Sequence, residues 1–449
     1  MLSEALAERA AQGRPIRVGL IGTGKFGGGL AAQISRMRGM EVVAIADIQL
    51  ENARYAYEMS CGVDNVVAVD SAQALSNAAL AGRRAILEDG LLLAEAEGID
   101  VVVEATGLTE VGARMAPAVL ESGKHLVMVN VETDVTIGAL LRRKADSAGV
   151  VYSLVDGDQP GVTMNIIDWA WSLGFEVVAA GRGTMLFADD PTGTPDNTAE
   201  RYGFDEETIA RRRINLKMYN SFRDGTKAQV EATAIANMAG LVPDVRGMHE
   251  PSCDLADIPR LCALREEGGL LSQHGVIELA NSVATDGQTV LNDPLNMGVF
   301  VVVRTDHPFI REDLGAYFLH GGGDGKNFLL YRPYHLVAVE APITIARAAL
   351  SRQPTGAPRS VPSADVVTTA KRDLRAGETV DGGGGYTVIG QSEKATVARD
   401  EGLLPLGLSE GALLKRDIAQ GQTLTYADVE LNEDSSVLQL RREQDRQVW

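Results

Sequence analysis

Residues 16–27 read IRVGLIGTGKFG: a mainly apolar run, Ile16–Ile21, is followed at once by the glycine pattern Gly22-Thr23-Gly24-Lys25-Phe26-Gly27. Continuous rather than alternating apolarity predicts a strand buried on both faces, as in a parallel sheet. The glycines allow a tight turn and let a pyrophosphate approach the N-terminus of the next helix. Asp47 ends the following predicted strand, where a carboxylate can accept hydrogen bonds from ribose hydroxyls. Together these features predict a dinucleotide-binding βαβ unit.

The pattern continues outward from this unit as alternating strands and helices. Further strands are predicted at 41–46, 101–103, 126–129 and 150–154, and helices at 27–37, from 52, from 72, at 112–121 and at 136–148. This βαβα order is typical of a doubly wound parallel sheet. We therefore predict an α/β protein whose residues 1–155 form a Rossmann domain.

A second, central domain is predicted for residues 156–352, with a largely antiparallel sheet in an α+β arrangement. Helices are expected at 160–173 and 341–350, and strands at 175–180, 298–304 and 329–331. Segments 216–222 and 226–233 flank Arg223-Asp224-Gly225, which predicts a β-hairpin. We expect this domain to bind substrate and to mediate dimerisation, and leave open whether its last helix returns to the Rossmann domain.

The C-terminal part follows a linker, 352–362, that is rich in Pro, Gly and Ser. It contains an internal repeat: Lys371-Arg372-Asp373-Leu374 and Lys415-Arg416-Asp417-Ile418 each precede a Gly-x-Thr pattern at the same spacing. Short β elements with paired turns are typical of a compact module. A small β-rich module is therefore predicted for residues 363–440.

Composition and charge exclude some functions. The 449 residues include 61 Asp and Glu against 42 Lys and Arg, a formal net charge of −19, which disfavours binding to nucleic acid and to anionic membranes. No apolar run approaches the ~18 residues of a membrane span, and the acidic N-terminus is unlike a signal peptide. Three cysteines, Cys61, Cys253 and Cys262, show neither disulfide nor zinc spacing. We expect a cytoplasmic protein.

Several polar and glycine residues follow strand ends, and the carboxyl ends of parallel strands line the ligand crevice. The loop Glu104–Gly107 and Asn130 are therefore expected beside the cofactor, with ordinary helix capping as the alternative. The predicted cofactor-binding residues are Gly22, Gly24, Lys25, Phe26, Gly27, Asp47, Ala105, Thr106, Gly107 and Asn130. The Asp47 carboxylate favours NAD, and the nearby Arg54 keeps NADP as the alternative.

Lys227 is the first candidate catalytic residue. It alternates with Gln229 and Glu231, so the three are expected on one face of a strand. If that face borders the nicotinamide, the lysine can give a proton to a carbonyl as hydride arrives, and Glu231 can contact substrate. A solvated strand face is the alternative.

Four further residues are candidates for chemistry. Asp158 follows the last predicted Rossmann strand and is predicted to act in proton transfer, with capping of the next helix as the alternative. His335 is predicted as an acid or base, with a buried structural role as the alternative. Arg182 and Arg332 are predicted to bind a substrate anion. Met248-His249 shows no metal-ligand spacing and is expected to be structural.

Residues 16–27, 104–107 and 123–127 give a sequence that resembles the homoserine dehydrogenase-like family. Segments 128–138, 234–244 and 331–336 are similar to the branch of that family that carries an appended SAF-type domain, and the C-terminal repeat fits that domain. The branch includes the 1-deoxy-D-xylulose 5-phosphate reductoisomerase-like enzyme, which uses NADPH and a divalent metal. Asn130 is followed by Val131-Glu132, whereas homoserine dehydrogenases carry Asn-Lys, which disfavours homoserine as the substrate.

The resemblance implies an NAD(P)-dependent oxidoreductase. We expect hydride transfer to or from a small polar carbonyl or hydroxy compound, with a sugar phosphate as one member of that class, in a homo-oligomer. NAD is favoured over NADP, and the need for a divalent metal is left open. The alternative is a non-catalytic dinucleotide-sensing or scaffold protein whose SAF-type domain binds a sugar or a peptide.

Overall fold

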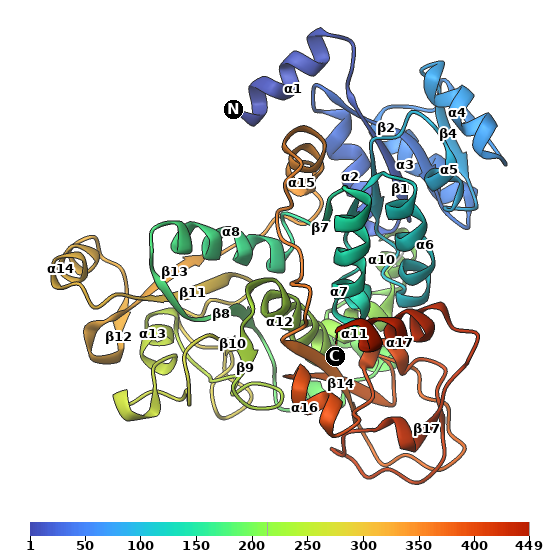
Figure 1. The fold of residues 1–449 in the computed structure, drawn as a ribbon. Helices are drawn as coiled ribbons and strands as arrows, with labels where there is room; N and C mark the ends of the chain where they lie inside the picture. The colour runs from blue at the N-terminus through green and yellow to red at the C-terminus, as the bar shows by residue number, and fades with distance from the viewer. Residues whose placement is uncertain (213, 449) are drawn as a thin grey trace. The chain divides into compact units, whose positions relative to one another are not determined.

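The computed structural model describes residues 1–212 and 214–448 and forms two compact units, each discontinuous in sequence (Figure 1). Unit 1 contains Met1–Val162, Leu336–Ser360 and the chain from Gln439 onwards. Unit 2 contains Thr163–His335 and Val361–Leu438. The predicted C-terminal module therefore lies in the same unit as most of the predicted central domain.

Unit 1 is built on a seven-stranded parallel sheet, which confirms the predicted doubly wound fold. The spatial order is β3-β4-β2-β1-β5-β6-β7. The strands are β1 (Ile16–Ile21), β2 (Met40–Ala46), β3 (Val66–Ala68), β4 (Arg84–Leu87), β5 (Val101–Glu104), β6 (His125–Met128) and β7 (Tyr152–Leu154). The chain reverses its direction of winding between β1 and β5, and ligands of such sheets bind at this switch point.

Helices cover this sheet and bury its apolar strands. They are α1 (Leu2–Ala11), α2 (Lys25–Ser35), α3 (Leu50–Ser60), α4 (Ala72–Leu80), α5 (Leu92–Glu95), α6 (Thr109–Glu121), α7 (Val131–Ala148), α15 (Ala341–Ala346) and most of α17 (Ser436–Val448). Leu20 of β1, Leu30 of α2 and Ile345 of α15 belong to one buried cluster. The last helix lies along α7, where the Gln444 amide accepts from Leu140 N (2.9 Å) and donates to Thr136 O (3.2 Å).

Unit 2 contains a six-stranded mixed sheet in the order β12-β13-β11-β8-β10-β9. The strands are β8 (Glu176–Thr184), β9 (Val242–Pro243), β10 (Val276–Asn281), β11 (Val299–Arg304), β12 (Gly321–Gly322) and β13 (Asn327–Arg332). β10 is parallel to β8 and β9, and the other pairs are antiparallel. The helices are α8 (Gln159–Ser172, which begins in unit 1), α9 (Pro195–Arg201), α10 (Glu206–Arg212), α11 (Leu216–Arg223), α12 (Thr226–Ala239), α13 (Ile258–Leu261), α14 (Pro308–Ala316) and α16 (Ala395–Asp400).

The predicted hairpin at 216–233 is wrong, because this segment forms the helices α11 and α12. The polar alternation from Lys227 to Thr233 hides a helical stripe, Ala228, Ala232, Ile235 and Ala239, which packs against the sheet. Gly225 has φ +85° and separates two helices rather than two strands. Alanine's high helix propensity is consistent with this outcome.

The C-terminal module consists of β14 (Ala364–Ala370) paired with β15 (Val388–Lys394), and of the short strands β16 (Leu413–Leu414) and β17 (Val429–Glu430). Its two repeat copies pair with each other: Leu374 and Ile418 exchange backbone hydrogen bonds of 2.8 and 3.0 Å. Asp417 accepts from Ala376 N and Asp373 accepts from Gln420 N, both at 2.9 Å. Each aspartate thus binds the equivalent backbone N–H of the other copy.

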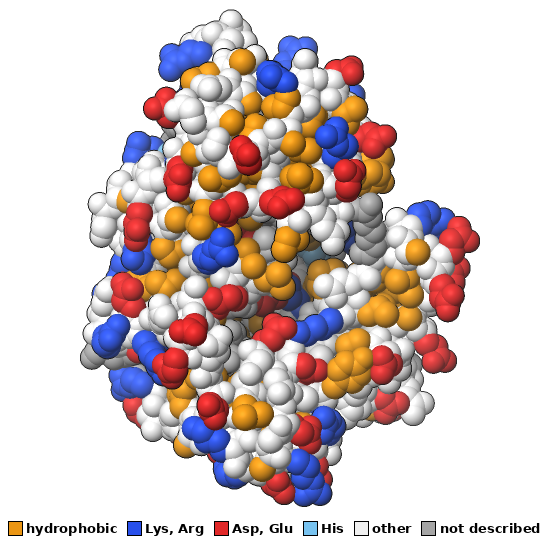
Figure 2. Space-filling view, turned by 90° about the vertical axis from the view of Figure 1, so that its right-hand side faces the viewer, with side chains coloured by type: hydrophobic (Ala, Val, Ile, Leu, Met, Phe, Trp, Pro, Cys, Tyr) orange, Lys and Arg blue, Asp and Glu red, His pale blue; other side chains and the backbone are white. Residues whose placement is uncertain are grey.

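The surface carries mixed charge. On the face drawn in Figure 2, Lys and Arg side chains are interspersed with Asp and Glu side chains and with hydrophobic groups. Within the part of the chain that the structure describes, every helix is too short or too polar to cross a membrane.

Candidate active site

The glycine turn between β1 and α2 is set by backbone sterics. Gly22 has φ +88°, a conformation that glycine adopts without steric cost. A Cβ on Gly27 would lie 2.1 Å from the carbonyl oxygen of Gly22, so only glycine lets α2 begin this close to β1. A Cβ on Gly24 would meet nothing within 4 Å. The turn therefore leaves open space at the helix N-terminus, which is where a dinucleotide pyrophosphate binds in such folds.

Asp47 is hydrogen-bonded to this turn. One carboxylate oxygen accepts from Thr23 N (3.0 Å) and from the Thr23 hydroxyl, and the other accepts from Gln49 N (2.9 Å). Asp47 N donates to Leu87 O (3.0 Å), which aligns the end of β2 with β4. The side chain thus fixes the turn and also presents a negative charge beside it. Both properties suit a group that contacts the ribose of a bound dinucleotide.

The loop after β5 lies against the same turn. Ala105 N donates to Ile21 O (2.9 Å), and a Cβ on Gly22 would come within 3.1 Å of the Ala105 carbonyl. Glu104 is buried, and one of its oxygens accepts from Thr106 N (2.8 Å) and the Thr106 hydroxyl. Burial raises the pKa of this carboxyl. Its other oxygen has no hydrogen-bond partner among the described residues. The predicted residues 105–107 and Gly22 are therefore neighbours.

Asn130 caps a helix. Its side-chain oxygen accepts from Thr133 N (3.1 Å) at the start of α7, and its amide donates to Leu108 O (2.9 Å). The residue is buried. These contacts support the capping alternative and tie α7 to the loop after Gly107, so Asn130 positions that loop.

Unit 2 contains a separate group of polar residues, which starts on α12. In this helix, which the structure describes throughout, Lys227 is the one residue that is not buried. Lys227 and Glu231 are four residues apart and share a helical face. Gln229 does not share that face, because its amide donates to Gly247 O (2.8 Å) and accepts from Ser392 N (2.9 Å). The predicted common face is therefore wrong for Gln229.

Arg182 on β8 and Glu231 on α12 form a buried ion pair. The two residues are 4% and 2% exposed, and the Arg182 guanidinium donates to the Glu231 carboxylate and to Gly183 O (3.0 Å). Buried charges require such partners, since the free-energy cost of removing an ion from water is large. The structure thus brings together two residues that sequence analysis named separately as substrate-binding.

The loop 244–250 forms a charged group that sequence analysis missed. Glu278 on β10 is buried and accepts from His249 N and Glu250 N (3.0 Å each) and bonds the His249 ring (2.8 Å). This hydrogen bond raises the pKa of His249. Met248-His249 lacks a recognisable spacing, and Glu278 lies far along the chain. Only the fold could place them together.

The C-terminal module holds this loop from the other side. Gly247 N donates to Ser392 O (2.8 Å), and the Arg246 guanidinium pairs with Glu393 and Glu401 (2.7 Å each). The module also buries Lys371, whose ammonium donates to Asp224 (2.7 Å) just before α12 begins. The module therefore supports both the loop and the start of the helix that carries Lys227.

The remaining predicted residues have local partners. Asp158, in unit 1, directly precedes α8: its carboxylate accepts from Gln159 N and its carbonyl from Val162 N (3.0 Å each), which supports the capping alternative. In unit 2, His335 Nδ1 bonds Met297 O (2.9 Å), and the Arg332 guanidinium stacks on Tyr334 at 4.4 Å from the ring centroid. Lys25 is exposed at the first turn of α2, and Phe26 packs against the unit 1 core.

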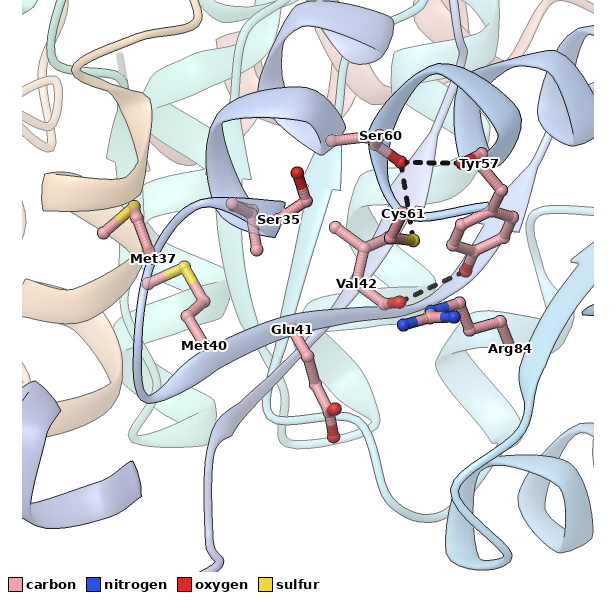
Figure 3. Close-up of a pocket in the computed structure, with 11 residues that line it drawn as sticks. Ser35, Met37, Met40, Glu41, Val42, Tyr57, Ser60, Cys61 and Arg84 are labelled. Atoms are coloured by element: carbon pink, nitrogen blue, oxygen red, sulfur yellow. Dashed lines mark hydrogen bonds between the residues drawn. The ribbon is translucent and has the colours of Figure 1, made fainter. Parts of the chain in front are cut away.

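A cavity of about 140 Å³ lies elsewhere in unit 1 (Figure 3). It is lined by Met40 and Val42 at the start of β2, by Tyr57 and Cys61 of the α3 end and by Arg84 of β4. The glycine turn is at the carboxyl ends of the parallel strands, so this cavity is not part of the dinucleotide site. Across residues 1–212 and 214–448, no group of three or more His, Cys, Asp or Glu side chains is arranged to hold a metal ion.

Comparison with protein families defines the class of the protein. Residues 22–153 match the NAD-binding domain of homoserine dehydrogenase, and residues 157–341 match the catalytic domain of oxidoreductase DRL. These matches support an NAD(P)-dependent oxidoreductase that binds a nicotinamide dinucleotide. The predicted homoserine dehydrogenase-like nucleotide domain is thereby confirmed, and neither match extends to the C-terminal module.

Solved structures give distant likenesses only. A hyperthermophilic archaeal homoserine dehydrogenase in complex with NADPH is 15% identical, with TM-score 0.41, over 75% of this chain and 98% of that chain. A probable dehydrogenase from Thermotoga maritima is 13% identical, with TM-score 0.40, over 75% and 90%. A myo-inositol dehydrogenase from Corynebacterium glutamicum is 13% identical, with TM-score 0.40, over 76% and 90%. A search of curated proteins gave no match.

Proposed function

We propose that this chain transfers hydride between NAD and a small polar carbonyl or hydroxy compound, with Lys227 exchanging the proton. The observation that carries the proposal is the Asp47 carboxylate bonded to the glycine turn, beside open space at the N-terminus of α2. The two family matches supply independent support for an oxidoreductase. When bound, the nicotinamide ring supplies the hydride chemistry.

The preference for NAD follows from charge. Asp47 presents a carboxylate where the ribose hydroxyls of a dinucleotide bind in this type of turn. A 2′-phosphate in its place would add a second negative charge, and two unit charges ~4 Å apart repel by roughly 4 kcal/mol at an effective dielectric constant near 20. Arg54, exposed one turn into α3, is the group that could offset this repulsion.

Lys227 suits the role of proton donor. It is half-buried on a helix whose other residues are all buried. In the direction of reduction, Lys227 gives a proton to the carbonyl oxygen while the carbonyl carbon accepts hydride, so the product is the hydroxyl compound. The Arg182–Glu231 pair lies one turn further along the helix and supplies polar contacts for the substrate. Sugar phosphates are one subclass of the proposed substrates.

The proposal is tested in two steps. NADH and NADPH are titrated against the protein by nicotinamide fluorescence, and tighter binding of NADH is expected. The protein is then assayed with a panel of hydroxy acids, aldehydes and sugar phosphates by the change in absorbance at the nicotinamide band. Failure to bind either dinucleotide, or binding without turnover of any panel compound, would overturn the proposal and favour the scaffold alternative.

A further inference from the structure

The loop that carries Glu250 runs beside the edge of the unit 2 sheet. Glu278 uses its carboxylate to accept from His249 N, Glu250 N and its own neighbour Leu279 N, at 2.9–3.1 Å. In the register of β10 and β8, Glu278 lies opposite Gly181 and Leu279 opposite Arg182. Glu278 is therefore occupied with the backbone of the loop that carries Glu250, and the charge of Arg182 acts on the Glu250 carboxyl.

The backbone of this loop is strained. Met248 has φ +65° and Glu250 has φ +48°, in the left-handed region that non-glycine residues rarely adopt. Such a conformation is unfavourable for a non-glycine residue and persists only where surrounding contacts impose it. Here the contacts are those of Glu278 with the loop backbone and those of Gly247 with Gln229 and Ser392. Strain of this kind occurs preferentially at functional sites.

The Glu250 carboxyl is poorly satisfied by the protein. Its Oε1 is closed off from solvent and has no hydrogen-bond partner among the residues that the structure describes. The residue as a whole is only half-buried, so it is not sealed in the core. Arg182, whose charge acts on Glu250, already donates to Glu231 and to Gly183 O. A buried polar oxygen without a partner destabilises the protein, and a ligand that hydrogen-bonds to it can recover this loss.

We infer that the carboxyl of Glu250 binds substrate directly, through a hydrogen bond to a neutral hydroxyl or carbonyl oxygen. The inference rests on the proposed function and identifies a substrate-binding residue outside the predicted set. The carboxylates of Glu231 and Glu278 offset the charges of Arg182 and of protonated His249 in this part of unit 2. Without an excess of positive charge, this position does not favour a phosphate or carboxylate, so the hydroxyl-bearing end of the substrate occupies it.

The protonation of Glu250 follows from its surroundings. Burial and the negative charge of Glu278 outweigh Arg182 and raise the pKa of Glu250 to about 8. The other charged groups around it are Glu231 on α12, His249 and Asp244 on its own loop, and Arg265, which pairs with Asp244. At pH 7 the Glu250 carboxyl is therefore neutral, and its O–H donates a hydrogen bond to a substrate oxygen. Above pH 8 that donor is lost.

The test compares Glu250→Gln and Glu250→Ala with the exposed control Glu312→Gln, using the panel compound that is turned over fastest. Glutamine keeps a neutral hydrogen-bond donor, so the KM of Glu250→Gln should stay within about 3-fold of the parent value at pH 7. The KM of the parent should rise above pH 8, and that of Glu250→Gln should not. Alanine should raise KM by about 10-fold or more without changing NADH affinity or lowering Tm, since the Oε1 atom that it removes has no hydrogen-bond partner among the described residues. Unchanged KM in both variants would overturn the inference and leave the proposed function standing.

If no panel compound is turned over, the proposed function fails, and the same variants are compared by thermal shift with each panel compound. A compound that raises the Tm of the parent protein but not that of Glu250→Ala would still support Glu250 as a ligand-binding residue. Equal shifts in the two proteins, or no shift in either, would overturn the inference as well.

Discussion

The glycine turn of unit 1 and the charged group of unit 2 are built in opposite ways. In the turn, the decisive constraints are steric and local, since Gly22 and Gly27 are five positions apart and Thr23 bonds Asp47, which directly follows the next strand. In unit 2, Arg182 pairs with Glu231 on a distant helix, and the loop with Glu250 bonds Glu278 and the C-terminal module. A short motif can encode the first, whereas only the complete fold creates the second.

The largest expected effect comes from breaking the buried pair of unit 2. Glu231→Ala leaves Arg182 buried without its carboxylate, so the free energy of unfolding should fall by about 3–5 kcal/mol. Glu207→Ala is the matched control, because Glu207 and its partner Arg211 are largely exposed and such pairs contribute ~1 kcal/mol or less. Urea denaturation of both variants measures the difference. Equal stability losses would mean that burial does not distinguish the two pairs.

A buried carboxyl without a cationic partner should instead destabilise the fold when it is ionised. Asp134 on α7 is bonded by the Tyr152 hydroxyl (2.7 Å), and burial raises its pKa to about 7, above the ordinary 3.8. Because the folded-state pKa is raised, the neutral form stabilises the fold. That contribution is complete below pH 4 and is lost as the pH rises through 7, by up to about 4 kcal/mol.

The measurement is the difference in unfolding free energy between the parent protein and Asp134→Asn from pH 4 to pH 8. Asparagine does not ionise, so the variant should gain stability relative to the parent as the pH rises. Other carboxyls titrate equally in both proteins and cancel in the difference. A difference that stays constant with pH would show that Asp134 does not carry this dependence.

A third comparison concerns chemistry rather than stability. Lys227→Met should lower kcat by at least ~10²-fold, which is the lower end for a positioned acid or base, while NADH affinity stays unchanged. Lys415→Met, at an exposed position in the C-terminal repeat, is the control. A kcat equal to that of the control would remove Lys227 from the site and direct attention to His335 and Asp158.

The sequence predicts the βαβ unit well because its signals are local. A continuous apolar strand, three glycines and an aspartate after the next strand are sufficient, and the doubly wound parallel sheet follows from the alternation of strands and helices. The strands β3 and β4 were not predicted, because they span only Val66–Ala68 and Arg84–Leu87 and are too short to give a distinct pattern. Strands of this length depend on their neighbours in the sheet for stability.

The sequence indicates only some residues of the candidate site in unit 2. Arg182, Lys227 and Glu231 were named, but Lys227 and Glu231 were placed on a strand, because polar residues at alternate positions outweighed the alanine stripe of α12. Glu250 was missed for a different reason. Its significance lies in a positive φ, a carboxyl oxygen without a partner and a contact across 28 positions, and none of these is visible in residue type or spacing.

The smallest expected effect concerns the glycine turn, where Asp47 both accepts hydrogen bonds from Thr23 and presents a negative charge. Asp47→Asn keeps a hydrogen-bond acceptor for Thr23 but removes the charge, whereas Asp47→Ala removes both. If the charge sets cofactor choice, Asp47→Asn should bring the NADH and NADPH dissociation constants about 10-fold closer together, since hydrogen bonds to charged groups contribute ~1.5–3 kcal/mol. Asp47→Ala should in addition weaken the binding of both cofactors by loosening the turn.

Screening by salt should reduce the parent's preference for NADH over NADPH, because the repulsive part of that preference is Coulombic. Arg54→Ala is the informative control: if Arg54 offsets the repulsion, its loss weakens NADPH alone. Equal or tighter NADPH binding in the parent protein would show that the Asp47 carboxylate acts only on the turn.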